Sequence, residues 1–126
     1  MSKRRSLDHL DKLPMTVGRE AVHVGLFAGR DNYVVHGQVR GDSDVEGAIM
    51  IGPDGLWVGN ITADVVVVKG RVEGNILARF KLELRPSARI KGDLSSPLIA
   101  VAEGAVVQGH VSPDSIVTRF TDRRTH

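Results

Sequence analysis

One seven-residue motif occurs six times along this chain at nearly even spacing. It reads small residue, any residue, apolar residue, any residue, glycine, any residue, apolar residue, and His23 and Ser43 are its two polar exceptions at the apolar positions. A unit this short cannot bury a hydrophobic face alone, so it must be one coil of an array in which neighbouring coils cover one another. The copies start at Ala21, Gly37, Gly55, Gly70, Ala88 and Ala105, which are 16, 18, 15, 18 and 17 residues apart.

A pair of mostly apolar residues, two positions apart, precedes each motif, and a seventh pair follows the last one. Spacing by two is typical of a β-strand that buries one face. The turn between pair and motif has three residues in most coils but one residue at His36 and at Lys69, so turn length varies while the strands keep their period. The pairs are Met15/Val17, Tyr33/Val35, Ile49/Ile51, Val66/Val68, Leu82/Leu84, Ile99/Val101 and Ile116/Thr118.

With about 17 residues and three apolar segments per coil, the sequence predicts an all-β protein, a parallel β-solenoid of about six three-sided coils. Residues 15–118 are expected to form the solenoid domain, between flexible tails at 1–14 and 119–126. Three columns of inward side chains are expected. They are Val35, Ile51, Val68, Leu84 and Val101; Val39, Trp57, Val72, Ile90 and Val107; and Phe27, Ile61, Ile76, Leu94 and Val111.

Composition and charge argue against several functional classes. Residues 21–112 carry nine Lys/Arg and ten Asp/Glu, so the body lacks the overall positive charge typical of nucleic-acid binding, and aromatic residues that could stack bases make up only 4% of the chain. Cysteine is absent, the five histidines show no metal-ligand spacing, and no glycine-rich phosphate loop is present. We therefore expect no enzymatic activity, no metal, no cofactor and no nucleic-acid partner.

Three segments of the repeat resemble the bactofilins, a family of bacterial cytoskeletal proteins. They are Val72–Ala78 (VEGNILA), Ala88–Leu94 (ARIKGDL) and Val101–Gly109 (VAEGAVVQG), and the resemblance extends over residues 15–118. It implies a right-handed β-helix with short disordered tails. It also implies nucleotide-independent polymerisation through the coil ends into filaments that scaffold cell-shape or cell-wall machinery.

The resemblance further implies a homopolymer that also contacts cell-wall or morphogenesis proteins. The expected location is the cytoplasm, including the periphery of the inner membrane. The membrane-targeting tail of the family is usually a short hydrophobic stretch at the N-terminus, which the first six residues, MSKRRS, do not contain. Lys3, Arg4 and Arg5 are instead expected to make a weak contact with anionic lipid; the alternative is a solvated tail.

The two ends of the solenoid are the first candidate interaction sites. An uncapped solenoid ends in strands with unpaired backbone groups and an exposed core, and no helix of useful length is predicted at either end. The expected polymerisation interface consists of Met15, Val17, Ile116, Thr118 and Phe120. Phe120 is expected either at a subunit junction or folded over its own core.

An outward-facing stripe is the second candidate. Solvated sheets usually place polar residues at such positions, so an apolar stripe indicates lateral contact with another filament or a partner. Val34, Met50 and Val67 are the expected contact residues. The alternatives are a register that slips by one residue and a tail that covers the stripe. The full stripe is Val34, Met50, Val67, Glu83, Ala100 and Val117.

Two other functional classes compete with the structural polymer. A monomeric solenoid that binds ice or polysaccharide would need regular threonine ladders or an aromatic platform, and the sequence has neither. An acyltransferase of the left-handed β-helix class would keep a strict six-residue repeat, whereas this repeat is about 17 residues long with variable turns.

Overall fold

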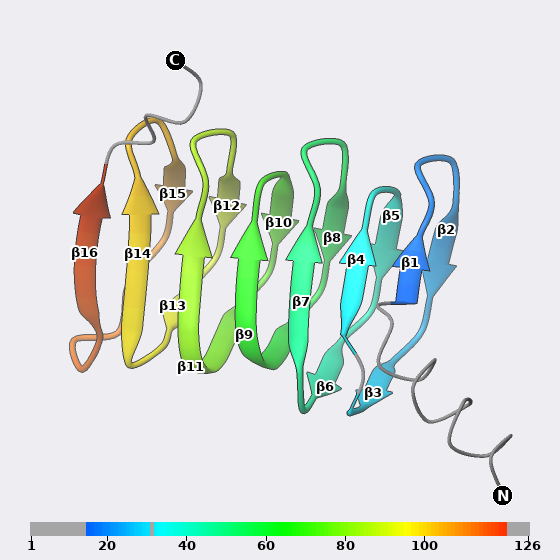
Figure 1. Ribbon diagram of the computed structural model, residues 1–126, viewed down its shortest axis with the longest axis horizontal. Helices are drawn as coiled ribbons and strands as arrows, with labels where there is room; N and C mark the ends of the chain where they lie inside the picture. Colours follow the sequence, from blue (N-terminus) through cyan, green and yellow to red (C-terminus); the bar gives the residue numbers. More distant parts are fainter. Residues whose placement is uncertain (1–14, 31, 121–126) are drawn as a thin grey trace, which may run out of the picture.

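The computed structural model describes residues 15–30 and 32–120, and it confirms the predicted solenoid (Figure 1). Within these residues the chain forms sixteen β-strands and no helix, and every strand pair is parallel. In Figure 1 the chain rises along the near strands, crosses the top and descends along the strands behind while it advances from right to left. This winding is right-handed, as parallel crossover connections almost always are.

Two parallel sheets run along the rod. The second sheet has six strands in the order β2 (Val22–Val24), β5 (Gln38–Arg40), β8 (Leu56–Val58), β10 (Arg71–Glu73), β12 (Arg89–Lys91) and β15 (Val106–Gln108). The first sheet has the main order β1 (Met15–Val17), β4 (Tyr33–Val35), β7 (Ala48–Ile51), β9 (Ile61–Val68), β11 (Ile76–Leu84), β14 (Leu98–Ala102) and β16 (Ile116–Phe120).

A third side closes each coil between the second sheet and the next strand of the first sheet. It contains the short strands β3 (Phe27–Gly29), β6 (Ser43–Val45) and β13 (Leu94–Ser95). In the middle coils the third-side strand runs on without interruption into the first sheet. For this reason β9 pairs with β6 at its start and with β7 further along.

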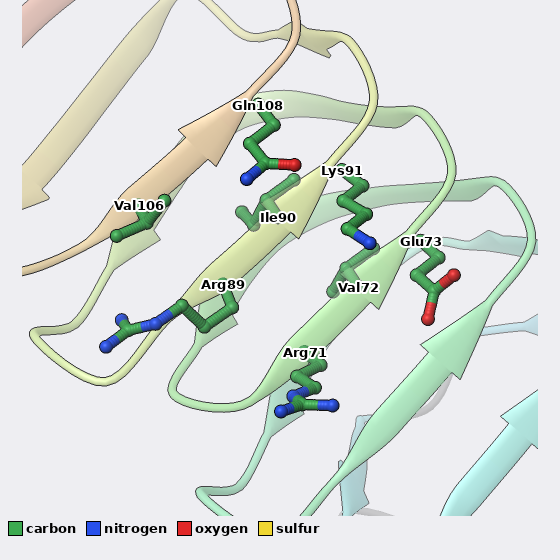
Figure 2. A pocket seen from close by; sticks show the side chains of 8 residues that line it. All are labelled: Arg71, Val72, Glu73, Arg89, Ile90, Lys91, Val106 and Gln108. Atoms are coloured by element: carbon green, nitrogen blue, oxygen red, sulfur yellow. The ribbon is translucent and has the colours of Figure 1, made fainter.

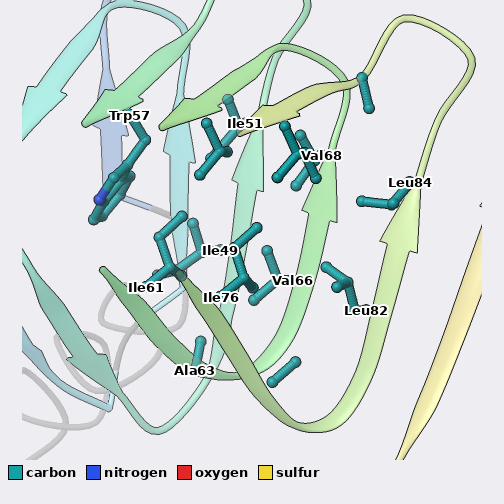
Figure 3. Close-up of a cluster of buried hydrophobic side chains, with 14 of the residues drawn as sticks. Ile49, Ile51, Trp57, Ile61, Ala63, Val66, Val68, Ile76, Leu82 and Leu84 are labelled. Carbon is teal, nitrogen blue, oxygen red and sulfur yellow. The ribbon is translucent and has the colours of Figure 1, made fainter. Parts of the chain in front are cut away.

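The core contains the three predicted columns and further inward residues beside them (Figure 3). In the middle coils their side chains are fully buried, as at Ile51, Trp57 and Ile76, whereas Val101 and Val107 in the last coils are only partly buried. The side chain of Phe27 lies outside the described part of the structure. The sequence-derived columns omitted two inward columns. One is a short column on the third side, formed by Val45, Ala63 and Ala78. The other consists of the first members of the residue pairs on the first sheet, which are Tyr33, Ile49, Val66, Leu82 and Ile99.

The glycine of each motif forms a corner that only glycine fits. Gly92 has φ +147°, and a Cβ atom on it would lie 2.0 Å from the carbonyl oxygen of Gly74 in the previous coil. Side-chain acceptors stack beside this corner, because the Oδ1 atom of Asn75 accepts a hydrogen bond from the backbone N–H of Asp93 at 3.1 Å. Equivalent bonds join Asp42 to Asn60, Asn60 to Asn75, and Asp93 to His110.

The two polar exceptions in the motif are accommodated differently. Ser43 is buried and paired with the backbone of Thr62, whose N–H donates to the Ser43 Oγ atom at 3.1 Å. His23 lies in the column of Val39 and Trp57 and is only half-buried, because it belongs to the first coil.

The predicted seventh pair, Ile116/Thr118, is wrong by one residue. Val117 aligns with the inward Ile99, so Ile116 and Thr118 face outward. The cause is the turn 112–115, closed by a 3.0 Å bond from the N–H of Ser115 to the carbonyl of Ser112, which has one residue more than segment 95–97 of the preceding coil.

Candidate assembly surfaces

The C-terminal end of the rod exposes its core. Val111 and Val117 occupy the columns of Leu94 and Ile99, which are buried, yet they are 39% and 43% exposed because no coil covers them. Among the described residues, β15 and β16 are the edge strands of the two sheets at this end, and one side of each has no pairing partner there. Open edges and an exposed apolar core are features that natural proteins normally cover.

The N-terminal end has the same construction. β1 and β2 are the edge strands of the two sheets there, and the inward residues Val17 and His23 are half-buried. No helix within residues 15–30 and 32–120 covers either end. The described solenoid is therefore open at both ends.

The residues predicted for polymerisation lie on the expected strands, but Ile116 and Thr118 differ from the prediction in the direction of their side chains. Met15 and Val17 lie on β1, and Ile116, Thr118 and Phe120 lie on β16, so the two groups sit on opposite edge strands of the first sheet. Only the side chains of Val17, Ile116 and Thr118 are described, and the latter two point to the outer face.

Val117 belongs to the exposed core and was missed as an end residue. Its inward direction could have been found from the number of residues in the preceding turn, whereas a constant period gives the wrong direction. Lys3, Arg4 and Arg5, the predicted membrane contact, lie outside the described residues.

The lateral stripe faces outward as predicted. Val34, Met50 and Val67 align with one another across β4, β7 and β9, between residues that point into the core. Val117 does not belong to the stripe, because Thr118 takes the position next to Ala100. Ala48 and Val65 extend this apolar surface on the same strands. Whether the surface makes lateral contacts stays a prediction.

A charged row on β11 ends the apolar surface. Lys81 and Glu83 are the outward residues there, next to Val65 and Val67, and Glu83 forms a 3.5 Å salt bridge with Arg85. A lateral partner on the apolar surface would therefore contact β4, β7 and β9 before it meets charge.

A β-bulge on β11 ties three coils together on the third side. Between Ala78 and Lys81 the register shifts, and both bulge residues, Arg79 and Phe80, face solvent. The guanidinium of Arg79 donates to the Asp44 carboxylate at 2.6 Å and to that of Asp64 at 3.1 Å. These hydrogen bonds raise the pKa of Arg79 above its ordinary value.

Two concave regions lie on the outer faces of the described residues. A hollow of about 250 Å³ lies on the second sheet between Arg71, Arg89, Lys91 and Gln108 (Figure 2). A larger hollow of about 590 Å³ lies along the third side. Within the described residues, no three His, Cys, Asp or Glu side chains are grouped so that they could hold a metal ion. Nor do these residues contain a helix that could cross a membrane.

Comparison with known proteins agrees with this architecture. The family model "Bactofilin: Polymer-forming cytoskeletal" matches residues 15–112. Bactofilin BacO of Myxococcus xanthus (strain DK1622) is 33% identical over 98 residues, which cover 78% of this chain and 78% of BacO. Bactofilin BacP of the same organism is 30% identical over 95 residues, which cover 75% of this chain but only 40% of BacP.

No solved structure matches the chain significantly. The family match nevertheless covers nearly all of the solenoid that the strands of this chain form. The chain belongs to the bactofilin family of polymer-forming cytoskeletal proteins.

Proposed function

We propose that this protein polymerises end to end, without nucleotide, into filaments that serve as a structural scaffold. The observation that carries this proposal is the exposed core at the C-terminal end, where Val111 and Val117 lack the coil that covers their counterparts Leu94 and Ile99. A second copy placed on this end supplies the missing coil.

Stacking of subunits would repeat the contacts that already hold the coils together. Coils within the subunit pair through parallel ladders at a spacing of about 4.8 Å, and each inward column buries apolar side chains against the next coil. An added subunit continues both features, so it pairs open backbone groups and removes apolar surface from water. Such assembly needs no bound nucleotide, because burial and pairing supply the driving force.

The cellular role that fits such a filament is a scaffold in the cytoplasm, including the periphery of the inner membrane, for cell-shape or cell-wall machinery. Membership of a polymer-forming cytoskeletal family supports the structural role. A non-enzymatic role also fits the outer faces, which carry ladders of single side chains and hollows without grouped ligands in the described part of the chain. The partners are a second copy of this chain and morphogenesis proteins.

The test is to place a charge in the exposed core. Val117→Arg should give a folded, soluble monomer or small oligomer, because assembly would bury a guanidinium without a partner. Phe120→Arg, on the last residue of β16, should act in the same direction. Gln38→Arg is the matched control, because Gln38 is exposed on the outer face of the second sheet, on a strand that pairs with β2 on one side and with β8 on the other.

Light scattering and negative-stain electron microscopy without nucleotide measure assembly, and circular dichroism measures folding. The unmodified protein and Gln38→Arg should form filaments. An unmodified protein that stays monomeric at high concentration would refute end-to-end assembly. Filaments of normal length from folded Val117→Arg would show that the C-terminal end does not form the junction.

A further inference from the structure

We propose that the outer face of the second sheet binds the surface of an anionic lipid bilayer. This face belongs to the folded solenoid and is separate from the N-terminal residues Lys3, Arg4 and Arg5. It is defined by the outward residues of β2, β5, β8, β10, β12 and β15, and it is called the second-sheet face below. Its residues are Val22, Val24, Gln38, Arg40, Leu56, Val58, Arg71, Glu73, Arg89, Lys91, Val106 and Gln108.

The strand register places these side chains on one surface. The central residue of each strand, such as Val39, Trp57 or Val72, is fully buried, so the residues on either side of it point outward. Figure 2 shows this alternation, with Arg71 and Arg89 aligned on neighbouring strands and Val72 and Ile90 on the opposite side. The ladder makes the face a shallow sheet surface suited to a flat partner.

The charge of the second-sheet face is strongly positive, although the body as a whole is nearly neutral. Arg40, Arg71, Arg89 and Lys91 stand against the single acidic residue Glu73, so the face has a net charge of 4 − 1 = +3. No salt bridge in the described part of the chain involves Arg40, Arg71 or Lys91. These cations are available to an anionic partner.

The acidic residues gather on a different side of the solenoid. Asp44, Asp64 and Asp93 lie on the third side or its corner, where the first two are paired with Arg79. On the first sheet, Lys81 is next to Glu83 on β11. A negatively charged surface is therefore attracted more strongly to the second-sheet face than to the third side.

Exposed apolar residues on β2 and β15, next to the strands that carry Arg40 and Arg89, favour a bilayer over other anionic partners. Val22 is 59% and Val24 73% exposed, and Val106 is 40% exposed. Surfaces that lie in the membrane interface combine such apolar side chains, which enter the headgroup region, with Lys and Arg, which contact lipid phosphates. The hollow of about 250 Å³ between Arg71, Arg89 and Lys91 is open to a headgroup phosphate.

Arg89 is held in position by its own chain. Its Nη1 atom donates to the carbonyl of Ala88 at 2.9 Å and to that of Gly104 at 3.3 Å. The guanidinium is thereby kept at the edge of the hollow, while Arg71 and Lys91 supply the cations that are free to move toward phosphate. These two residues are the ones to change in a test.

The strength of the contact rests on the proposed function, because a filament would present this face once per subunit. Each subunit contributes a weak, salt-sensitive attraction, and linked copies add their attractions without any new contact. Filaments should therefore bind vesicles more tightly than single subunits do.

The test measures co-sedimentation of the full chain with vesicles. The starting protein carries Lys3→Gln, Arg4→Gln and Arg5→Gln, so that the N-terminal cations do not contribute. Vesicles of phosphatidylcholine with one third phosphatidylglycerol should bind it, and vesicles of phosphatidylcholine alone should bind it much less. Arg71→Glu with Lys91→Glu should lower binding to the anionic vesicles at least about tenfold.

The matched control exchanges the same residue type on two faces. Lys91→Glu should weaken vesicle binding clearly more than Lys81→Glu, which lies on the outer face of the first sheet. Equal effects of these two variants, or anionic binding unchanged in the double variant, would overturn the proposal. Circular dichroism checks folding, and Arg71→Gln with Lys91→Gln replaces the double variant if that one unfolds.

Two further measurements separate this proposal from nucleic-acid binding and from the proposal of end-to-end polymerisation. If the starting protein does not bind the vesicles but binds duplex DNA through Arg71 and Lys91, the second-sheet face binds nucleic acid and the lipid proposal fails. Electron microscopy of the same samples without vesicles tests assembly independently. If the protein stays as single subunits and still binds anionic vesicles through Arg71 and Lys91, the lipid proposal stands and the proposal of end-to-end polymerisation is refuted.

Discussion

At the corner of each coil, the backbone of one glycine lies directly on the backbone of the glycine in the previous coil. Gly59, Gly74 and Gly92 all have positive φ, and a Cβ on each would lie 2.0 Å from the carbonyl oxygen below it. The motif places a glycine at each of these positions. It gave no sign of the close contact between coils, because that contact depends on how coils stack and not on the local sequence.

Gly92→Ala should therefore lower the free energy of unfolding severely, by roughly 3 kcal/mol or more, through backbone strain and a clash with Gly74. Gly18→Ala is the control, because nothing lies within 4 Å of a Cβ there and its φ is not positive. Urea unfolding of both variants measures the difference. Similar midpoints for the two would contradict the stacked corner.

Two adjacent residues in β11 test the direction of the side chains. Ile76→Asp should be severely destabilising, because it buries a carboxylate between Ile61 and Leu94. Leu77→Asp introduces the same group one position along, where the side chain is 46% exposed, and should change the unfolding free energy by less than about 1 kcal/mol. Thermal unfolding followed by circular dichroism compares them. Equal stability of the two variants would mean that the register is wrong.

Among the strands, the alternation of the first sheet was the most predictable feature. Pairs spaced by two residues predicted which side of β4, β7, β9, β11 and β14 is buried, and the register bears this out. The position of Val117 could not be obtained from the period alone, because one extra turn residue reverses the direction of every side chain that follows. The bulge at Arg79 and Phe80 was also missed, because the period does not show where within a coil an extra residue is inserted.

The lateral stripe gives the prediction that belongs to the sheets. Val67→Lys should leave the subunit folded and its filaments single, because the outward position accepts a charge that repels a second filament. Glu83→Lys provides a comparison at an already charged position of the same ladder and should leave bundling unchanged. Electron microscopy scores bundle width. Unfolding of Val67→Lys would show that this side chain points into the core.

For the whole molecule, stability and assembly should be linked. An uncovered terminal coil is stabilised when a second subunit covers it, so the thermal midpoint of the unmodified protein should rise with protein concentration. Val117→Arg should show a midpoint that does not depend on concentration, whereas Gln38→Arg should behave like the unmodified protein. Scanning calorimetry over a hundredfold concentration range measures this. If the thermal midpoint of the unmodified protein does not change with concentration, assembly does not stabilise the terminal coils and the prediction is wrong.

The sequence predicted the class of fold, the number of coils and the strands that form the ends. It did not predict the net charge of each face, because the +3 charge of the second-sheet face is hidden in a body with nine basic and ten acidic residues. Charges that alternate along the chain are sorted onto faces only when turn lengths are known, so this feature required the structure.

The contacts of Arg79 have a mechanical consequence. Ladder pairing joins each coil only to the next one, but Arg79 reaches both Asp64 in the adjacent coil and Asp44 in the coil beyond it. A coil in the middle of the rod thus cannot separate from its neighbour without also breaking a bond to a third. Under tension along its axis, the subunit should lengthen first by peeling of coils at its two ends, while the segment from Asp44 to Arg79 yields last and as one unit.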